Sequence, residues 1–356
     1  MQAKFFIKML PKFLLLAVLS PLLAAFLTPF WSSQTAYVHT GLELIRLFII
    51  ICSFLIVFSV HKQNDQINVI IGLGLLMVGI FDLFHIFFHQ DFSWSNPDYY
   101  DLSVRYWILG RFMEALVFLA AAKTCGRNIN TYLGAAVAIL SALGLSLIVL
   151  KYRELFPVLL SENSGLTPLK IVLEYIIIAL YLLSIFFLFR KARLNAQAVV
   201  YNYLLIALFF AIPAEICFTL YNHITDYSLI LGHVLKIFSY YFIFRGIFVS
   251  SVTFPYNELK TTQKKMKRIF NHFPMALVCF DQESKITFVN TRAQNILGCP
   301  AKDIINLTVN AFLLKFNFKW WNTEELPPNE DISQNNTTSK RYLCDIVDST
   351  GRKRIL

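Results

Sequence analysis

Charged residues are scarce in this chain of 356 residues. Only 15% are Asp, Glu, Lys or Arg, whereas soluble domains carry about 25%. Hydrophobic residues make up 56% of the chain, with 34 phenylalanines. This composition excludes an ordinary soluble domain over most of the length and indicates a membrane protein. The net charge of +10 gives little support to nucleic-acid binding, because the basic residues fall where membrane topology places them. We therefore expect the lipid bilayer as a partner, and no nucleic acid.

Cysteine is also sparse, and the usual catalytic motifs are missing. The six cysteines are scattered and form no CxxC pair, so neither a disulfide framework nor a zinc site is predicted from them. The sequence has no Walker loop, no GGDEF-like segment, no nucleophile–base pair and no phospho-accepting histidine motif. We expect no catalysis by these residues, and the enzymatic class of a parent protein stays open.

Long apolar runs dominate the first 250 residues. A helix needs roughly 20 apolar residues to cross about 30 Å of hydrocarbon, and lipid requires helices because it offers no partner to unpaired backbone groups. The first run is longer than the apolar part of a signal peptide, and seven more follow, so we expect it to be a retained span. The eight predicted spans cover residues 13–30, 41–60, 69–88, 104–122, 132–150, 171–189, 199–220 and 229–250.

Basic residues in the connections predict the orientation of these spans. The connections on one side carry nine such residues, namely Lys4, Lys8, Lys12, Lys62, Lys123, Arg127, Arg190, Lys191 and Arg193. The connections on the other side carry three, namely Lys151, Arg153 and Lys170. The side with nine is expected in the cytoplasm. This predicts a multi-pass protein of the inner (cytoplasmic) membrane with both termini in the cytoplasm.

The chain changes character after residue 250. The stretch "VTFPYNELKTTQKKMKRIF" is basic, and its Pro255 predicts a break in the helix. A heptad spacing relates five residues: Leu259, Thr262, Met266, Ile269 and Phe273. Such a spacing predicts a short, imperfect coiled-coil seam and a homodimer. A juxtamembrane helix whose lysines meet anionic lipid is the simpler interpretation, and it is compatible with the first.

The last part of the chain has the pattern of a soluble domain. "MALVCFD" (275–281) and "KITFVN" (285–290) predict two strands, and "TRAQNILG" predicts a short helix that ends at Gly298. "RYLCDIVD" and "GRKRIL" predict a hairpin around "DSTG". The polar stretch 321–340 is expected to be a loop.

Two resemblances follow from these stretches. "IFNHFPMALVCFDQESKITFVNTRAQNILGCPAKDII" (269–305) resembles a PAS domain. Over residues 35–259 the chain resembles the third family of bacterial membrane-associated sensor (MASE-type) domains. That resemblance depends on "HTGLELIRL" (39–47), "GIFDLFHIFFH" (79–89), "RYWILGRFMEAL" (105–116) and "YFIFRGIFVSSVTFPYNEL" (241–259).

The resemblances imply a domain organisation and a class of function. We expect a tail and first span (1–34), a sensor bundle (35–254), a signalling linker helix (255–268) and a PAS domain (269–356) that lacks its last strand. The expected fold class is a polytopic α-helical membrane bundle of about eight spans plus a cytoplasmic α+β PAS-like domain. Such regions are input modules of sensor histidine kinases, which act on response regulators, or of diguanylate cyclases. The resemblance supplies no ligand.

Charged residues inside the spans are the strongest functional signal. Each costs about 2.5–3.5 kcal/mol at the membrane centre, so it should face the bundle interior or water. Apart from Arg245 at the inner end of the last span, they lie in the outer halves of six spans, with Glu114 near the midplane, and the first and fifth spans contain none. Ion pairs that fix helix packing are the simpler interpretation, but such pairs have no reason to avoid the inner halves. The pattern therefore favours a pocket that opens outward. The candidate pocket residues are His39, Glu43, Asp82, His85, Arg111, Glu114, Glu174, Glu215, His233 and Lys236.

The residue types leave the stimulus open. Histidine binds metals or haem iron and titrates near neutral pH, and His85 and His89 lie one helical turn apart. A small organic or amphipathic ligand, a metal or haem, a proton or redox state, and a mechanical or lipid signal all remain, so the cofactor and the metal are unknown. A haem-binding protein that uses His85 and His233 is an alternative function. A transporter is another, although no internal repeat is present.

Three residues are expected to carry the signal out of the membrane. Arg245 lies at the inner end of the last span, and Pro255 and Tyr256 follow it. A stimulus that changes the pairing of the polar residues would shift the last span, and these residues would pass the shift to the seam and the PAS domain.

Overall fold

The computed structural model describes residues 2–60, 66–89, 100–123, 129–161, 165–194, 199–221, 223, 225–317, 319–320, 344–347 and 353–355. The predicted loop 321–340 and the basic residues Lys62 and Arg127 therefore lie outside the described residues. The chain forms two compact units, which meet in the sequence between Tyr256 and Asn257. Each unit is described by itself.

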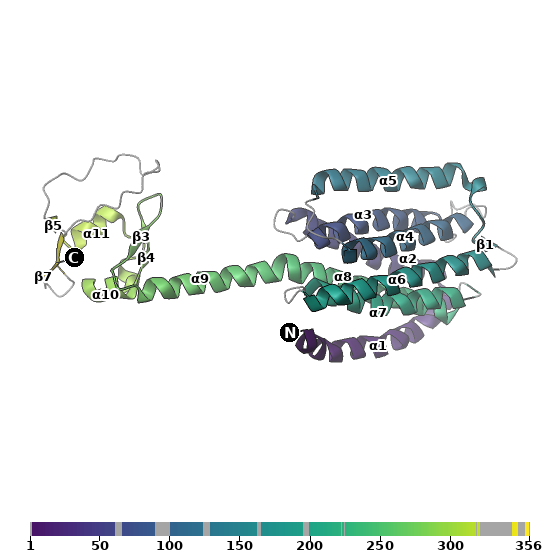
Figure 1. The fold of residues 1–356 in the computed structure, drawn as a ribbon, viewed down its shortest axis with the longest axis horizontal. Helices are drawn as coiled ribbons and strands as arrows, with labels where there is room; N and C mark the ends of the chain where they lie inside the picture. The colour runs from purple at the N-terminus through teal and green to yellow at the C-terminus, as the bar shows by residue number, and fades with distance from the viewer. Residues whose placement is uncertain are drawn as a thin grey trace. The chain divides into compact units, whose positions relative to one another are not determined.

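Eight long helices build the first unit (Figure 1). Their bounds are α1 Gln2–Ser33, α2 Thr35–Ser59, α3 Gln66–Phe87, α4 Tyr100–Lys123, α5 Thr131–Lys151, α6 Pro168–Leu194, α7 Val199–Leu220 and α8 Tyr227–Phe248. In the described part of the chain, seven helical segments are long and apolar enough to cross a membrane. The helix that fails this criterion is α4, which contains five charged residues. The predicted fold class, a helical membrane bundle followed by a small α/β region, is confirmed.

Successive helices run in opposite directions, so the first residues of the even-numbered helices and the last residues of the odd-numbered helices lie at the same end of the bundle. We call the end at which α2, α4, α6 and α8 begin the distal end, because α8 begins there and continues at its other end into α9. A short hairpin, β1 Leu160–Ser161 with β2 Gly165–Leu166, lies between α5 and α6 at the distal end. Asp101 of α4 holds it by accepting hydrogen bonds from the backbone N–H groups of Leu159 and Leu160, at 2.7 and 2.8 Å.

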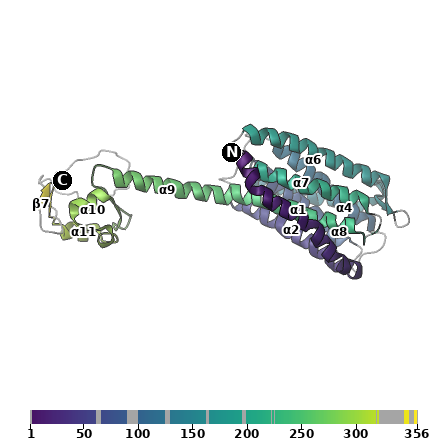
Figure 2. The same ribbon diagram turned by 90° about the horizontal axis from the view of Figure 1, so that it is seen from below.

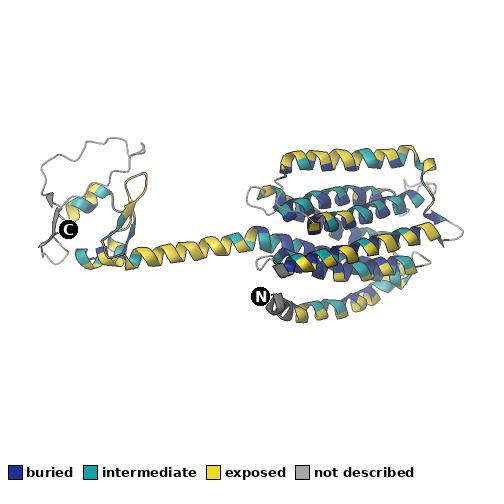
Figure 3. Cartoon of the chain, in the orientation of Figure 1, coloured by how far each residue is buried: buried dark blue, intermediate teal, exposed yellow. Residues whose placement is uncertain are grey.

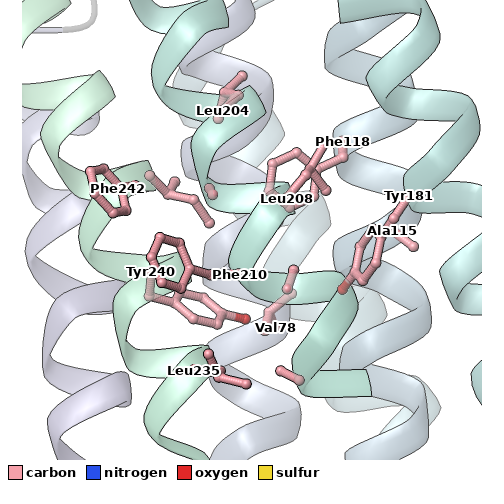
Figure 4. Packing of buried hydrophobic residues seen from close by; sticks show 14 of the residues in the cluster. Val78, Ala115, Phe118, Tyr181, Leu204, Leu208, Phe210, Leu235, Tyr240 and Phe242 are labelled. Carbon is pink, nitrogen blue, oxygen red and sulfur yellow. The ribbon is translucent and has the colours of Figure 1, made fainter. Parts of the chain in front are cut away.

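The core of the bundle lies among α3, α4, α7 and α8. Figure 4 shows the apolar packing, with Phe210, Leu208 and Phe118 among its buried members. The contact of α3 with α4 requires a glycine, because a Cβ at Gly74 would collide with Val117. Helix α5 packs against α3, and α1 packs against α8 and α2. Figure 1 shows these two outer helices on opposite sides of the bundle, and Figure 2, seen from below, shows α1 in front of the other helices. Outward faces are exposed (Figure 3), as expected for surfaces that contact lipid.

The helix that leaves the bundle is not broken at Pro255, so that prediction was wrong. Helix α8 continues into a π-helical segment, Val249–Thr253, and then into α9, Phe254–His272. Proline has no N–H group, so it cannot donate the backbone hydrogen bond of a regular α-helix. A π-helical turn, whose hydrogen bonds span one more residue than those of an α-helix, allows the helix to continue. Asn68 of α3 contacts this segment, since its Nδ2 donates to Ser250 Oγ at 2.9 Å and to Ser251 Oγ at 3.1 Å.

The second unit contains the predicted strand–turn–strand–helix succession. Strands β3 Val278–Phe280 and β4 Ile286–Val289 pair antiparallel, and α10 Thr291–Leu297 follows. Asn290 caps α10 through its Oδ1, and Gly298 ends it in the left-handed conformation with φ 63°. The remaining elements are α11 Val309–Lys315, β5 Lys319–Trp320, β6 Cys344–Val347 and β7 Lys353–Ile355. Strands β5, β6 and β7 form one antiparallel sheet, which includes the predicted hairpin.

Candidate functional site

A chain of buried ion pairs lies in the distal half of the bundle. It begins at Glu43 of α2, whose carboxylate pairs with Arg46 one turn later and also lies 2.9 Å from Nδ1 of His233 on α8. All three side chains are at most 4% exposed. Residues at i and i+3 share one face of a helix, so α2 presents an acid and a base together to α8.

Asp82 of α3 is the centre of this chain of pairs. Its Oδ1 lies 3.1 Å from Nη2 of Arg46 and 2.8 Å from Nη2 of Arg111 on α4. Two guanidinium groups on different helices therefore share one carboxylate. The aspartate joins α2, α3 and α4, and its side chain is fully buried.

The pairs continue from α4 to α7 and α8. Arg111 Nη1 lies 2.5 Å from Oε2 of Glu114, three residues later on the same helix. Glu114 also lies 3.3 Å from the Nζ atom of Lys236, which in turn lies 2.5 Å from Oε1 of Glu215. The hydroxyl of Tyr240 donates to Glu114 at 2.8 Å and accepts from Arg111 at 2.9 Å. A lysine, a tyrosine and two acids thus connect three helices.

Helix α6 contributes an acid, a base and a tyrosine. The Tyr181 hydroxyl accepts a hydrogen bond from Lys236 at 3.2 Å. Glu174, which neighbours Glu215, pairs with Lys170 at 3.0 Å. The sequence placed Lys170 in a connection, but the structure places it inside α6, where it is only 1% exposed and donates to the carbonyl of Phe218 at 2.5 Å.

A cluster of imidazole rings lies at the distal side of these pairs. We call His39, His85, His89 and His233 the histidine cluster; all four are buried. His39 stacks on His89 with ring centres 3.9 Å apart, and its ring centre lies 5.5 Å from that of His85 and 4.9 Å from that of His233. Three helices bring the cluster together, since His39 is on α2, His85 on α3 and His233 on α8.

Trp107 of α4 joins the histidine cluster to the ion pairs. Its ring centre lies 5.2 Å from that of His85, and the guanidinium carbons of Arg46 and Arg111 each lie 4.6 Å from it. A small cavity of about 50 Å³ lies beside it. All four members of the histidine cluster line the cavity, together with Ser103, Trp107, Lys170, Phe218 and Tyr221.

The structure brings the ten predicted pocket residues into one buried region. Arg46, Lys170, Trp107, Tyr181 and Tyr240 were not among those ten, and they complete the pairs. The three residues expected to carry the signal lie elsewhere. Arg245 lines a separate cavity of about 260 Å³ with Lys12, while Pro255 and Tyr256 lie near the start of α9, where Tyr256 is exposed.

Comparison with protein families assigns both parts of the chain. Residues 31–255 match the membrane-associated sensor domain, MASE3, and residues 264–327 match a PAS domain. The first match covers more than half of the chain. The chain belongs to the membrane-associated sensor family. No curated protein and no solved structure matches it.

The match to the sensor family contains the whole buried region described above, from His39 to Tyr240. A membrane-associated sensor domain followed by a PAS domain is a sensory input module of a signalling protein. The apolar helices make the chain a multi-pass membrane protein. Within this sensor, the ion pairs and the histidine cluster are the candidate functional site.

Proposed function

We propose that the chain detects a stimulus at the distal end of its bundle and passes it through α8 and α9 to the PAS domain and an output domain. The orientation predicted from the basic residues places the distal end outside the cytoplasm and both termini inside. The seam of α9 suits an output that works as a helical pair, so a histidine kinase acting on a response regulator is the output we propose. A diguanylate cyclase is the other output that the family allows.

The arrangement of α8 is the observation that carries this proposal. His233, Lys236 and Tyr240 follow one another at steps of three and four, so they share one face of the helix. Each contacts a different part of the buried region: His233 contacts Glu43, Lys236 contacts Glu215, and Tyr240 contacts Arg111 and Glu114. Any change in these pairs alters the forces on the helix that leaves the bundle.

Buried ion pairs have few intermediate arrangements, because each charged group needs a partner, and this suits an element with two states. A stimulus shifts such an equilibrium by the difference in its affinity for the two states. In the bundle, a ligand that draws Glu43 away from Arg46 would leave Arg46 to Asp82 alone, and Asp82 would bind Arg111 less strongly. The rearrangement would reach α8 through Glu114 and Lys236.

The exit of α8 gives the shift a mechanical path. Asn68 of α3 is hydrogen-bonded to the π-helical segment. A shift of α8 relative to α3 would therefore strain or break these two hydrogen bonds, at the point where α8 leads into α9. Leu259, Met266 and Ile269 of α9 are exposed, with relative exposures of 60%, 51% and 63%. We propose that these residues form the interface of a homodimer, as their heptad spacing indicates.

A chimera with a kinase output tests the proposal. Lys236→Met keeps the length of the side chain but removes the charge that joins Glu114 to Glu215, so it should change the output of a reporter strain at least several-fold at an equal amount of protein in the membrane. Lys151→Met is the matched control, because Lys151 lies at the distal end of α5 and is exposed. Equal outputs from Lys236→Met and the unmodified chimera would refute the proposal, and reduced membrane content alone would assign these pairs to packing.

A further inference from the structure

The histidine cluster contains ring nitrogens that lack partners. Nδ1 of His39 and Nε2 of His85 are buried and make no hydrogen bond to any residue that the structure describes. A buried nitrogen without a partner has lost the hydrogen bonds that it would make to water, so two of them beside one small cavity require an explanation. We propose that His39, Glu43 and His85 form a binding site for a divalent first-row transition cation of the Zn²⁺ class.

The spacing of the three residues fits one ion. One ligand atom from each residue lies within 4.8 Å of the other two. Zinc binds histidine nitrogen at about 2.0–2.1 Å in tetrahedral geometry, which separates neighbouring ligand atoms by about 3.3 Å. Rotations of the side chains that move each atom by about 1 Å close the difference. Helices α2 and α3 supply the ligands, so the ion would join two helices.

His85 has the environment of a metal ligand. Its Nδ1 lies 2.9 Å from the carbonyl oxygen of Ser103. A ring that donates Nδ1–H to a carbonyl carries no proton on Nε2, which then points a lone pair at the ion, and metal-binding histidines generally have such an outer hydrogen bond. The Ser103 hydroxyl donates to the backbone carbonyl of His85 at 2.9 Å and lies 2.9 Å from its Nδ1, so Ser103 contacts both the backbone and the ring of His85.

Two other histidines support the ligands. His233 lies 2.9 Å from Glu43 through its Nδ1 and so orients the carboxylate. His89 stacks on His39 and restricts the rotation of its ring. His39 and His85 also line the cavity of about 50 Å³, so a water in the cavity could supply a fourth ligand. That volume holds one or two waters.

The charges of the region also favour a cation. Five acidic side chains are buried in the described bundle (Glu43, Asp82, Glu114, Glu174 and Glu215). Four basic side chains are buried with them (Arg46, Arg111, Lys170 and Lys236). With neutral histidines the region has an excess of one negative charge, which a bound cation would offset.

The donor set and the volume select the class of ligand. Imidazole with carboxylate suits zinc, copper, nickel and iron, whereas Mg²⁺ and Ca²⁺ prefer oxygen ligands alone. Pockets for organic ligands are usually 300–1,000 Å³, a size that a haem also needs and that this cavity does not reach. The proposal that the cation is the stimulus rests on the proposed sensory function. The proposal that the cation binds at this site does not depend on that function.

Cobalt titration of the full chain tests the site. The protein is purified in detergent with a histidine-free tag, stripped with a chelator and titrated with Co²⁺, whose visible absorption reports coordination by nitrogen. We expect one equivalent to bind and Zn²⁺ to displace it. His39→Ala and His85→Ala should each weaken binding more than 100-fold, and His233→Ala, which removes a supporting contact, should weaken it about 10–100-fold. His223→Ala and His272→Ala are matched controls, because both side chains are exposed.

The outcomes separate the site from the sensory function. Absence of stoichiometric binding, or binding that survives the combined His39→Ala and His85→Ala changes, overturns the metal site. His85→Gln keeps a polar side chain of similar size, so loss of binding in that variant with an unchanged melting temperature supports the site even where His85→Ala fails to fold. The chimera is assayed in parallel with Zn²⁺ and with chelator. Binding without any response supports the site and refutes the cation as stimulus. A response to Lys236→Met without binding overturns the site and leaves the sensory function in place.

Discussion

Replacing Arg111 with methionine should destabilise the bundle more than any other single change among the ion pairs. The guanidinium group contacts three partners: Asp82 at 2.8 Å, Glu114 at 2.5 Å and the Tyr240 hydroxyl at 2.9 Å. Methionine fills similar space but carries no charge, so Arg111→Met leaves two buried carboxylates with fewer counter-charges.

The remaining contacts set the magnitude. Asp82 keeps Arg46 at 3.1 Å, and Glu114 keeps Lys236 at 3.3 Å and the Tyr240 hydroxyl at 2.8 Å. Removing one partner of a buried pair costs about 3–5 kcal/mol. Arg111→Met removes a partner from two acids, but each acid retains a second cation, so the expected cost is that of one broken pair. We therefore expect a loss of about 3–5 kcal/mol in the free energy of unfolding for Arg111→Met. A smaller loss is expected for Arg111→Lys, which keeps the charge but cannot reach both acids.

Equilibrium unfolding in mixed detergent micelles measures this loss. The combined Asp82→Asn and Arg111→Met protein is the informative control, because it removes the carboxylate together with its partner. It should be more stable than Arg111→Met alone by about 1–3 kcal/mol, the range for relieving an unsatisfied buried group. A loss below about 1 kcal/mol for Arg111→Met, or no recovery in the double variant, would show that Asp82 is not held as a charged partner of Arg111.

Three further predictions concern the exit of the bundle and the second unit. Asn68→Leu removes two hydrogen bonds to the π-helical segment and should change the reporter output of the chimera without changing Co²⁺ binding; an unchanged output would exclude this contact from signalling. Asn290→Asp keeps the cap of α10 but loses the donors to the carbonyls of Phe270 and Met275, so amide hydrogen exchange in β4 and α10 should accelerate at least tenfold, and unchanged exchange would contradict this role. In a background without other cysteines, Met266→Cys should form a disulfide-linked dimer on oxidation and Lys264→Cys should not; equal yields would refute the seam.

The sequence was sufficient to predict the helices and the polar residues within them. Apolar runs long enough to span a membrane can only be helical, so seven of the eight long helices follow from length and hydropathy in the described part of the chain, and α4, with its five charged residues, is the less apolar one. Charges in such runs are rare and face inward, which is why Glu43, Asp82 and Lys236 were expected inside the bundle, where the structure buries them. Neither argument predicts which charged residue pairs with which. The two members of a pair can lie on helices far apart in the sequence, such as α2 and α8, and only the packing of the helices brings them together.

The residues that were missed have ordinary sequence signals. Tyr181, Tyr240 and Trp107 lie in a chain that is 15% aromatic, so nothing separates them from aromatic residues that only fill space. Lys170 precedes the apolar run and was assigned to a connection, but Pro168 begins α6 two residues earlier and brings the lysine into the helix. Pro255 predicted a break, because proline usually ends a helix, and the π-helical segment before it was not foreseeable from composition.

That π-helical segment has a consequence for the phase of the helix. A residue advances an α-helix by about 100°, and a π-helical turn accommodates an additional residue. If Val249–Thr253 relaxed to α-helical geometry, every side chain after it would turn about the helix axis relative to His233, Lys236 and Tyr240. The seam residues Leu259 and Met266 would then face another direction, with no need for α8 to slide or tilt. A single turn of helix would thus convert a change in hydrogen bonding into a rotation.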